Sequence, residues 1–172
     1  GRTPIIAGNW KMFKTIPESL SLVEKIKAEL SGIEGIEVVV CPPYTSLSEV
    51  HKVLTGSKIY LGAQDLHWEK EGAYTGEISA GMLKDTGCSY VIIGHSERRA
   101  YFGETDEAVN RKIKSALACG ITPIVCVGET LDEREKGKTF EVIKRQTDNG
   151  LAGLKPGDVK MLVLAYEPVW AI

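Results

Sequence analysis

The sequence predicts an α/β fold built on a parallel β-sheet. Apolar runs of strand length, rich in β-branched residues, recur along the chain, and helical patterns lie between them. Successive runs begin roughly 20–40 residues apart, which is the length of one strand–helix unit. The runs are continuously apolar rather than alternating, as is typical of strands buried on both faces. No linker or low-complexity tract interrupts the pattern, so residues 1–172 are expected to form a single domain.

Six segments fit the strand pattern, and three others fit the helix pattern best. The expected strands are Pro4–Ala7, Ile36–Val40, Lys58–Gly62, Ser89–Ile93, Ile121–Val127 and Val159–Ala165. The expected helices open at Pro17, Thr105 and Thr139, and they end before Gly32, Gly120 and Gly150. Proline or a capping hydroxyl suits a first helical turn, and glycine commonly terminates a helix.

Composition and charge argue against several classes of partner. Hydrophobic residues make up 43% of the chain, charged residues 26%, and the formal net charge is -2, which does not favour nucleic acid or an anionic membrane surface. No apolar stretch is long enough for a transmembrane helix, and the N-terminal residues lack the long apolar run of a signal peptide. The four cysteines form no C-x-x-C pair and no metal-ligand pattern. We therefore expect a cytoplasmic protein with buried free thiols and no metal site.

Polar residues follow the expected strands directly. They are Asn9 and Lys11, Gln64-Asp65, Gly94-His95-Ser96-Glu97, Gly128-Glu129 and Glu167. All lie at carboxyl ends of strands, where both open and closed α/β sheets bind ligands. Periodicity alone does not distinguish an open doubly wound sheet from a closed barrel. Chemistry drawn from several strands, and a first loop without G-x-G-x-x-G, favour the barrel.

Three of these residues could act together on an anionic substrate. Lys11 could neutralise negative charge, although a surface lysine is the simpler interpretation. His95 precedes an expected helix capped by Ser96, so the helix dipole would keep it neutral and able to donate to a carbonyl. A structural histidine is the alternative. Glu167 precedes Pro168, which stiffens the chain and could hold a base rigidly, although Glu-Pro pairs without function are common.

Glu97 beside His95 has two equally plausible interpretations. It could orient a basic residue or a polar group of a substrate. It could equally be a carboxylate favoured by the positive end of the helix dipole, without any catalytic part.

Six stretches resemble the triosephosphate isomerase family and occur in the family's order from end to end of the chain. They are Ala7-Gly8-Asn9-Trp10-Lys11-Met12, Gly62-Ala63-Gln64-Asp65, Gly72-Ala73-Tyr74-Thr75-Gly76-Glu77, Ile93-Gly94-His95-Ser96-Glu97-Arg98-Arg99, Cys126-Val127-Gly128-Glu129 and Ala165-Tyr166-Glu167-Pro168-Val169-Trp170-Ala171-Ile172. The resemblance implies a parallel (β/α)8 TIM barrel, of which this chain supplies about six βα units. It also implies an isomerase of glycolysis and gluconeogenesis. Such an enzyme interconverts dihydroxyacetone phosphate and D-glyceraldehyde 3-phosphate through an enediolate, without cofactor or metal.

The resemblance also implies roles for individual residues. Glu167 is expected to be the base, His95 the group that polarises the carbonyl, and Lys11 the cation that binds phosphate and stabilises the transition state. Asn9 is expected to help bind substrate. The expected supporting residues are Ser96, Glu97, Thr75 and Cys126, and the expected lid hinge is Pro168, Val169 and Trp170.

Two partners are expected besides the triose phosphate. The loop Gln64–Glu77 resembles the segment that joins two subunits in the family, so we expect a homodimer with Thr75 near the partner's site. Family members have about 250 residues, so strands seven and eight and half the phosphate site are missing here. We expect a separate C-terminal piece to complete the barrel. The alternatives are an inactive barrel fragment used for folding or assembly, and a different phosphosugar enzyme on the same barrel.

Overall fold

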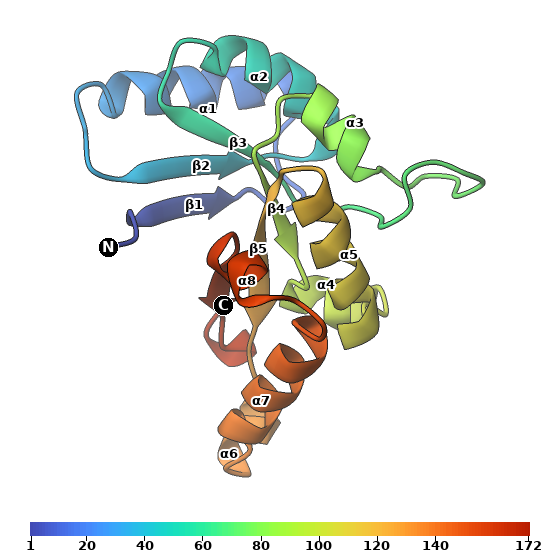
Figure 1. The fold of residues 1–172 in the computed structure, drawn as a ribbon. Helices are drawn as coiled ribbons and strands as arrows, with labels where there is room; N and C mark the ends of the chain where they lie inside the picture. Colours follow the sequence, from blue (N-terminus) through green and yellow to red (C-terminus); the bar gives the residue numbers. More distant parts are fainter.

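The computed structural model describes residues 1–172, and it contains one curled sheet of six parallel strands in the order β1-β2-β3-β4-β5-β6 (Figure 1). The strands are β1 (Ile5–Asn9), β2 (Glu37–Cys41), β3 (Ile59–Ala63), β4 (Tyr90–Ile93), β5 (Thr122–Val127) and β6 (Val163–Tyr166). Each strand pairs with its predecessor, with register partners such as Gly8 with Val40 and Val91 with Pro123. The predicted α/β class and parallel sheet are confirmed.

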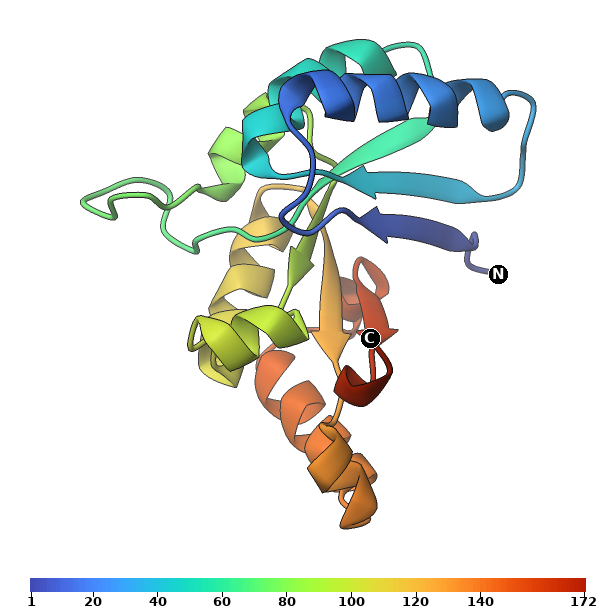
Figure 2. The same ribbon diagram turned by 180° about the vertical axis from the view of Figure 1, so that it is seen from behind.

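Helices connect the strands and pack against one face of the sheet. They are α1 (Ile16–Glu29), α2 (Leu47–Leu54), α3 (Ala80–Asp85), α4 (Ser96–Tyr101), α5 (Asp106–Ala118), α6 (Leu131–Glu135), α7 (Thr139–Gly150) and α8 (Pro156–Lys160), with short 3-10 turns at Tyr44–Ser46 and Val169–Ala171. The three helices expected from the sequence are present. The loop between β3 and α3 projects from the body in both ribbon views (Figures 1 and 2). None of the helices is long and apolar enough to cross a membrane.

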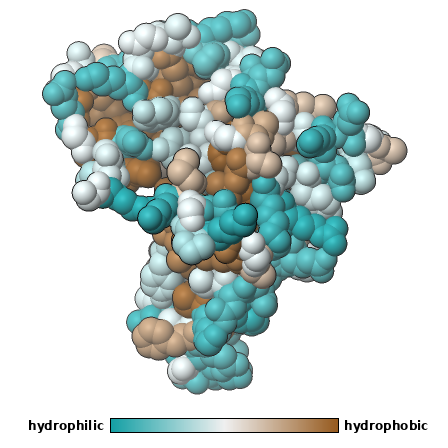
Figure 3. All heavy atoms as spheres, in the orientation of Figure 1, coloured by the Kyte–Doolittle hydropathy of each residue, from teal (hydrophilic) through white to brown (hydrophobic).

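Alternation of side chains divides the core between the two faces of the sheet. The larger cluster lies between sheet and helices and includes Val40, Leu61, Val91 and Ile113. A smaller cluster occupies the opposite face; its buried members are Val39, Cys41, Tyr90, Ile92, Ile124 and Cys126. Figure 3 shows apolar residues at the surface toward the middle of the molecule, between polar patches.

The outer strands β1 and β6 are less buried than the sequence predicted. Each has only one neighbouring strand, and Ile6 and Leu164 remain 61% and 45% exposed. The expectation of burial on both faces therefore holds for the central strands and is wrong for these two. Arg2, just before β1, links the two ends of the sheet, because its guanidinium donates hydrogen bonds to the carbonyls of Lys160 (2.7 Å) and Leu162 (3.1 Å).

The sixth strand begins later than expected. The sequence predicted Val159–Ala165, but Val159 belongs to helix α8 and the strand starts at Val163. Pro156 occupies the first turn of α8, and the Asp158 carboxylate accepts a hydrogen bond from the Lys155 backbone N–H at 2.8 Å. Because this cap starts a helical turn, Val159 is helical although the local sequence pattern favours a strand.

Candidate active site

The expected site residues lie after three different strands at the same end of the sheet. Asn9 ends β1, His95 follows β4 and Glu167 follows β6. Because all six strands are parallel, their carboxyl ends meet at one edge of the curled sheet. Residues far apart in sequence are thereby brought within contact distance.

His95 is positioned by the turn from β4 into α4. Gly94 has φ +73, a left-handed conformation that glycine adopts without steric cost. His95 itself is the N-cap of α4, and its Nδ1 accepts a hydrogen bond from the Glu97 backbone N–H at 3.1 Å. The expectation that Ser96 caps this helix is therefore wrong, because Ser96 is its first residue and the imidazole already reaches the free N–H.

This cap defines the tautomer of His95. A ring nitrogen that accepts a hydrogen bond carries no proton, so in the neutral ring the proton is on Nε2. The carboxylate of Glu97 also lies near Nδ1, but 3.6 Å is too long for a hydrogen bond. His95 is 6% exposed, and its Nε2 lies 3.2 Å from Oε2 of Glu167.

Glu167 is held chiefly through its backbone. Its N–H donates to the carbonyl of Val127 at 2.8 Å, and two residues later Val169 donates to Glu129 at 3.0 Å. The Oε2 atom is buried and has no hydrogen-bond partner of good geometry. Cys126 lies beside it, and burial, reinforced by the Glu167 carboxylate, raises the pKa of the Cys126 thiol well above its usual range. The Glu167 carboxylate therefore faces a neutral thiol.

Lys11 adopts a left-handed backbone, with φ +53, which is uncommon for a residue other than glycine. Three contacts hold it there. Its N–H donates to Oδ1 of Asn9 at 2.9 Å, its carbonyl accepts from Nε2 of Gln64 at 2.8 Å, and its ammonium lies 2.8 Å from the Glu97 carboxylate. Glu97 thus connects the lysine to the helix that carries His95. Gln64 is a supporting residue to which the sequence analysis gave no role.

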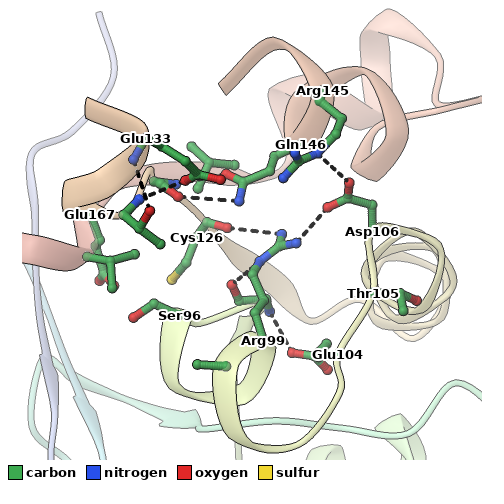
Figure 4. Close-up of a pocket in the computed structure, with 16 residues that line it drawn as sticks. Ser96, Arg99, Glu104, Thr105, Asp106, Cys126, Glu133, Arg145, Gln146 and Glu167 are labelled. Atoms are coloured by element: carbon green, nitrogen blue, oxygen red, sulfur yellow. Dashed lines mark hydrogen bonds and ion pairs between the residues drawn. The ribbon is translucent and has the colours of Figure 1, made fainter. Parts of the chain in front are cut away.

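Two neighbouring cavities contain these side chains. One of about 180 Å3 is lined by Asn9, Lys11, His95 and Glu97. A larger one of about 350 Å3 is lined by Ser96, Cys126 and Glu167, together with charged residues of α4 to α7 (Figure 4). The contact between His95 and Glu167 lies where the two meet. The smaller cavity, with its lysine and histidine, is the better match to a small anionic ligand.

Thr75 is not brought to this site within one chain. It is exposed on the projecting loop between β3 and α3 and lines neither cavity. No group of three or more His, Cys, Asp or Glu residues is arranged to hold a metal ion.

Comparison with known proteins identifies the family. The family model described as triosephosphate isomerase matches residues 4–172. The chain belongs to the triosephosphate isomerase family. It is 60% identical to the triosephosphate isomerase of Endomicrobium trichonymphae and 58% identical to that of Geobacter metallireducens, each over 171 residues that cover 99% of this chain and 68% of the relative.

A solved structure agrees with the sequence comparison. Triosephosphate isomerase from Bartonella henselae superposes with a TM-score of 0.91 at 44% identity, covering 98% of this chain and 69% of that one. The expected TIM-barrel fold and isomerase class are thereby confirmed. The chain corresponds to the N-terminal part of that barrel, and its sheet has six strands. That residues 1–172 form a single domain stays a prediction.

The carboxylate of Glu129 is fully buried and lies beside Trp170, a residue of the expected lid hinge. The sequence analysis noted that Glu129 follows a strand but gave it no role. Glu129 accepts hydrogen bonds from Tyr166 (2.9 Å) and from the indole of Trp170 (3.3 Å), and Arg134 lies 3.2 Å away. Burial alone would raise its pKa, but hydrogen bonds from its own backbone N–H and from these side chains outweigh burial and lower the pKa to about 2. The carboxylate stays ionised and holds Trp170 in place.

A buried charge network below the site was also missed. Lys112 on α5 contacts both Asp65 (2.8 Å) and Glu104, and Glu104 accepts from the Gly94 N–H at 3.2 Å. Burial raises the pKa of Asp65 more than the neighbouring Lys112 ammonium lowers it. The network connects the start of the projecting loop to the residue preceding His95.

Proposed function

We propose that this chain interconverts dihydroxyacetone phosphate and D-glyceraldehyde 3-phosphate through an enediolate, as part of glycolysis and gluconeogenesis. The observation that carries the proposal is the pairing of His95 Nε2 with Glu167 Oε2 at 3.2 Å. One group is a hydrogen-bond donor in the neutral ring, and the other is a buried acceptor without a hydrogen-bond partner of good geometry. A substrate bound against this pair would meet a base at one carbon and a hydrogen-bond donor at the oxygen of the neighbouring carbonyl.

In this mechanism Glu167 removes a proton from one carbon of the triose and returns it to the other. The Nε2–H of His95 donates to the carbonyl oxygen and stabilises the negative charge that develops there. Lys11 supplies positive charge to the phosphate and the enediolate. Its strained backbone is held by Asn9 and Gln64, so the ammonium is positioned before substrate arrives.

The supporting residues act on these three. Glu97 fixes Lys11 by its ion pair and the His95 tautomer by its backbone N–H. Ser96 and Cys126 line the wall of the cavity beside Glu167. Asn9 binds substrate with the part of its amide that Lys11 does not occupy. Pro168, Val169 and Trp170 form the hinge of a lid, with Trp170 held by Glu129.

A separate C-terminal segment completes the barrel in this proposal. The chain spans about 68% of the length of its curated relatives, and the sheet has two unpaired edges, β1 and β6. Arg2 already links the segments beside these edges at one end of the sheet. Two further strands would pair with both edges, cover the exposed Ile6 and Leu164, and bring the rest of the phosphate site.

Complementation tests this function. The chain is mixed with a polypeptide corresponding to the C-terminal third of the Endomicrobium relative, and triose phosphate isomerisation is followed in a coupled assay. We expect activity from the mixture and little from either part alone. A stable complex without activity would favour the alternative of a non-catalytic fragment that serves folding or assembly. Absence of both a complex and activity would contradict the proposed second piece.

We also propose a homodimer joined by the Gln64–Glu77 loop, in the cytoplasm. His67 stacks on Trp68 and Tyr74, with centroids 4.3 and 4.6 Å apart, which gives the exposed loop a defined shape. Nearby Met12 and Phe102 are 93% and 68% exposed. A second copy would cover such apolar groups. Free thiols at all four cysteines suit a reducing compartment. Sedimentation of the completed enzyme should give a dimer, and a monomer at micromolar concentration would contradict this.

A further inference from the structure

The position of Glu167 depends on a residue that has no side chain. A Cβ atom placed on Gly128 would lie 1.8 Å from the backbone carbonyl oxygen of Glu167 and 2.6 Å from its carbonyl carbon. No side chain fits in that space, so the two backbones are in direct contact. Since Glu167 also donates its N–H to Val127 at 2.8 Å, the segment 127–128 determines where the Glu167 backbone lies.

Gln146 on α7 holds Gly128 from the other side. The Gly128 N–H donates to Oε1 of Gln146 at 2.8 Å, and Nε2 of Gln146 donates to the Gly128 carbonyl at 3.3 Å (Figure 4). Gln146 is 5% exposed, and its carboxamide takes both backbone groups of one residue. These two bonds take the place of the backbone hydrogen bonds that a neighbouring strand would make with Gly128 beyond the end of β5.

Helix α7, which carries Gln146, is packed and hydrogen-bonded to the rest of the chain. Val142, one turn earlier on the same face, is buried. The last turn is tied to α5, because the Asn110 amide donates to the carbonyls of Gly150 and Ala152, both at 2.9 Å. Because the helix is held in this way, the Gln146 side chain has little freedom to move, and it restricts the position of Gly128.

We propose that Gln146 is a positioning residue for the isomerisation: by holding Gly128 it fixes Glu167 relative to His95. The proposal rests on the function above, in which Glu167 is the base. A purely structural role is the competing explanation, because a buried carboxamide that satisfies backbone groups also stabilises the fold. The positioning role predicts that the surroundings of Glu167 change in a folded variant, whereas a purely structural role predicts that only stability changes.

The test compares three variants with the parent chain by NMR without substrate. Gln146→Met keeps the size of the side chain and removes both hydrogen bonds. Gln146→Glu keeps the acceptor for the Gly128 N–H. Lys144→Met, on the exposed face of the same helix, is the matched control. The readouts are the Glu167 carboxyl 13C resonance, assigned with Glu167→Gln, and the His95 15Nε2 resonance, with amide exchange at Gly128 as a monitor of the lost bond.

In Gln146→Met we expect Gly128 amide exchange about fivefold to tenfold faster, with displaced Glu167 and His95 resonances. Gln146→Glu should return both resonances partway, and Lys144→Met should leave them unchanged. In the completed enzyme, Gln146→Met should lower kcat by about 10- to 100-fold with little change in KM. Faster exchange with both resonances at parent positions would overturn the proposal.

A second variant keeps the test decisive if Gln146→Met does not fold. Gly128→Ala leaves Gln146 intact but forces the Glu167 backbone aside, so it should displace the same two resonances. Unchanged resonances in a folded Gly128→Ala variant would also overturn the proposal. All NMR readouts are independent of whether Glu167 is the base. Activity retained by Glu167→Gln would therefore refute the proposed role of Glu167 as the base without affecting this result.

Discussion

Nε2 of His95 and Oε2 of Glu167 lie 3.2 Å apart, although the two residues follow strands β4 and β6, which β5 separates in the sheet. The imidazole is oriented by its cap on α4, and the carboxylate by backbone contacts with the end of β5. Two independent supports thus converge on one pair of atoms. The variants below separate the contribution of each support from general effects on stability.

Replacing Glu167 with Gln should abolish most isomerisation while leaving the fold intact. The amide is nearly isosteric but cannot accept a proton from carbon, and general base catalysis is worth about 10²–10⁴-fold. The measurement is kcat in the completed enzyme, with circular dichroism of the chain as the folding control. Glu141→Gln, an exposed change on α7, should leave kcat unaltered. Parent-like turnover in Glu167→Gln would mean that another residue is the base.

Replacing Lys112 with Met should destabilise the chain by about 3–5 kcal/mol. The change leaves Asp65 and Glu104 buried, with only the partly exposed Arg98 beside them. Urea unfolding at neutral pH gives the free energy. Lys114→Met, on the exposed side of the same helix, should change it by about 0.5 kcal/mol or less. Similar losses for the two variants would show that the network adds no specific stability.

Acid should release the proposed lid hinge through Glu129. Its pKa is about 2 in the folded chain, below its ordinary value of 4.5, so the group binds protons more readily when the chain is unfolded. Its contribution to stability is therefore complete above about pH 5, declines as pH falls through 4.5, and is lost as pH falls through about 2.

The measurement for this hinge is the difference in unfolding free energy between the parent chain and Glu129→Gln at a series of pH values. The difference should be constant near neutrality and shrink in acid. Trp170 fluorescence should change over the same range, since its indole donates to Glu129. Glu135→Gln, an exposed change on α6, serves as the control. A difference that stays constant down to pH 2 would refute the depressed pKa.

Replacing Lys14 with Gly should stabilise the chain by about 1 kcal/mol. Lys14 has φ +78, and a left-handed conformation is unfavourable for any residue with a Cβ. Thermal unfolding measures the gain. Lys25→Gly, in the middle of α1, should have the opposite sign and cost about 1 kcal/mol. Destabilisation by both changes would show that Lys14 is not strained.

Strand ends were the most informative signal in the sequence. The fifth strand, expected at Ile121–Val127, lies at Thr122–Val127, because a long apolar run between polar residues leaves little choice of boundary. The polar residues after the strands then made Asn9, Lys11, His95 and Glu167 candidates for the site. Patterns failed where a local cap competed with them, as at the start of β6 and at His95, whose ring displaced Ser96 as the helix cap.

The sequence analysis did not predict contacts between distant elements. At two positions, however, the sequence pattern indicates that a polar residue is buried. Lys112 occupies the apolar stripe of α5 between Val109 and Ile113, which is a position where a lysine needs a buried partner. Gln146 likewise follows Val142 by one turn. The pattern reveals that such a residue is buried but not which atoms it meets, because Asp65 and Gly128 come from other parts of the chain.

The close approach at Gly128 has a consequence for mutational tolerance. In a saturation scan scored by enzyme activity, position 128 should reject every other amino acid, since even a methyl group would overlap the Glu167 backbone. Its profile would resemble that of a reactive residue, although glycine carries no reactive atom. Intolerance at this position therefore reports a spatial exclusion rather than chemistry, and any redesign of this enzyme has to keep glycine at this point of contact.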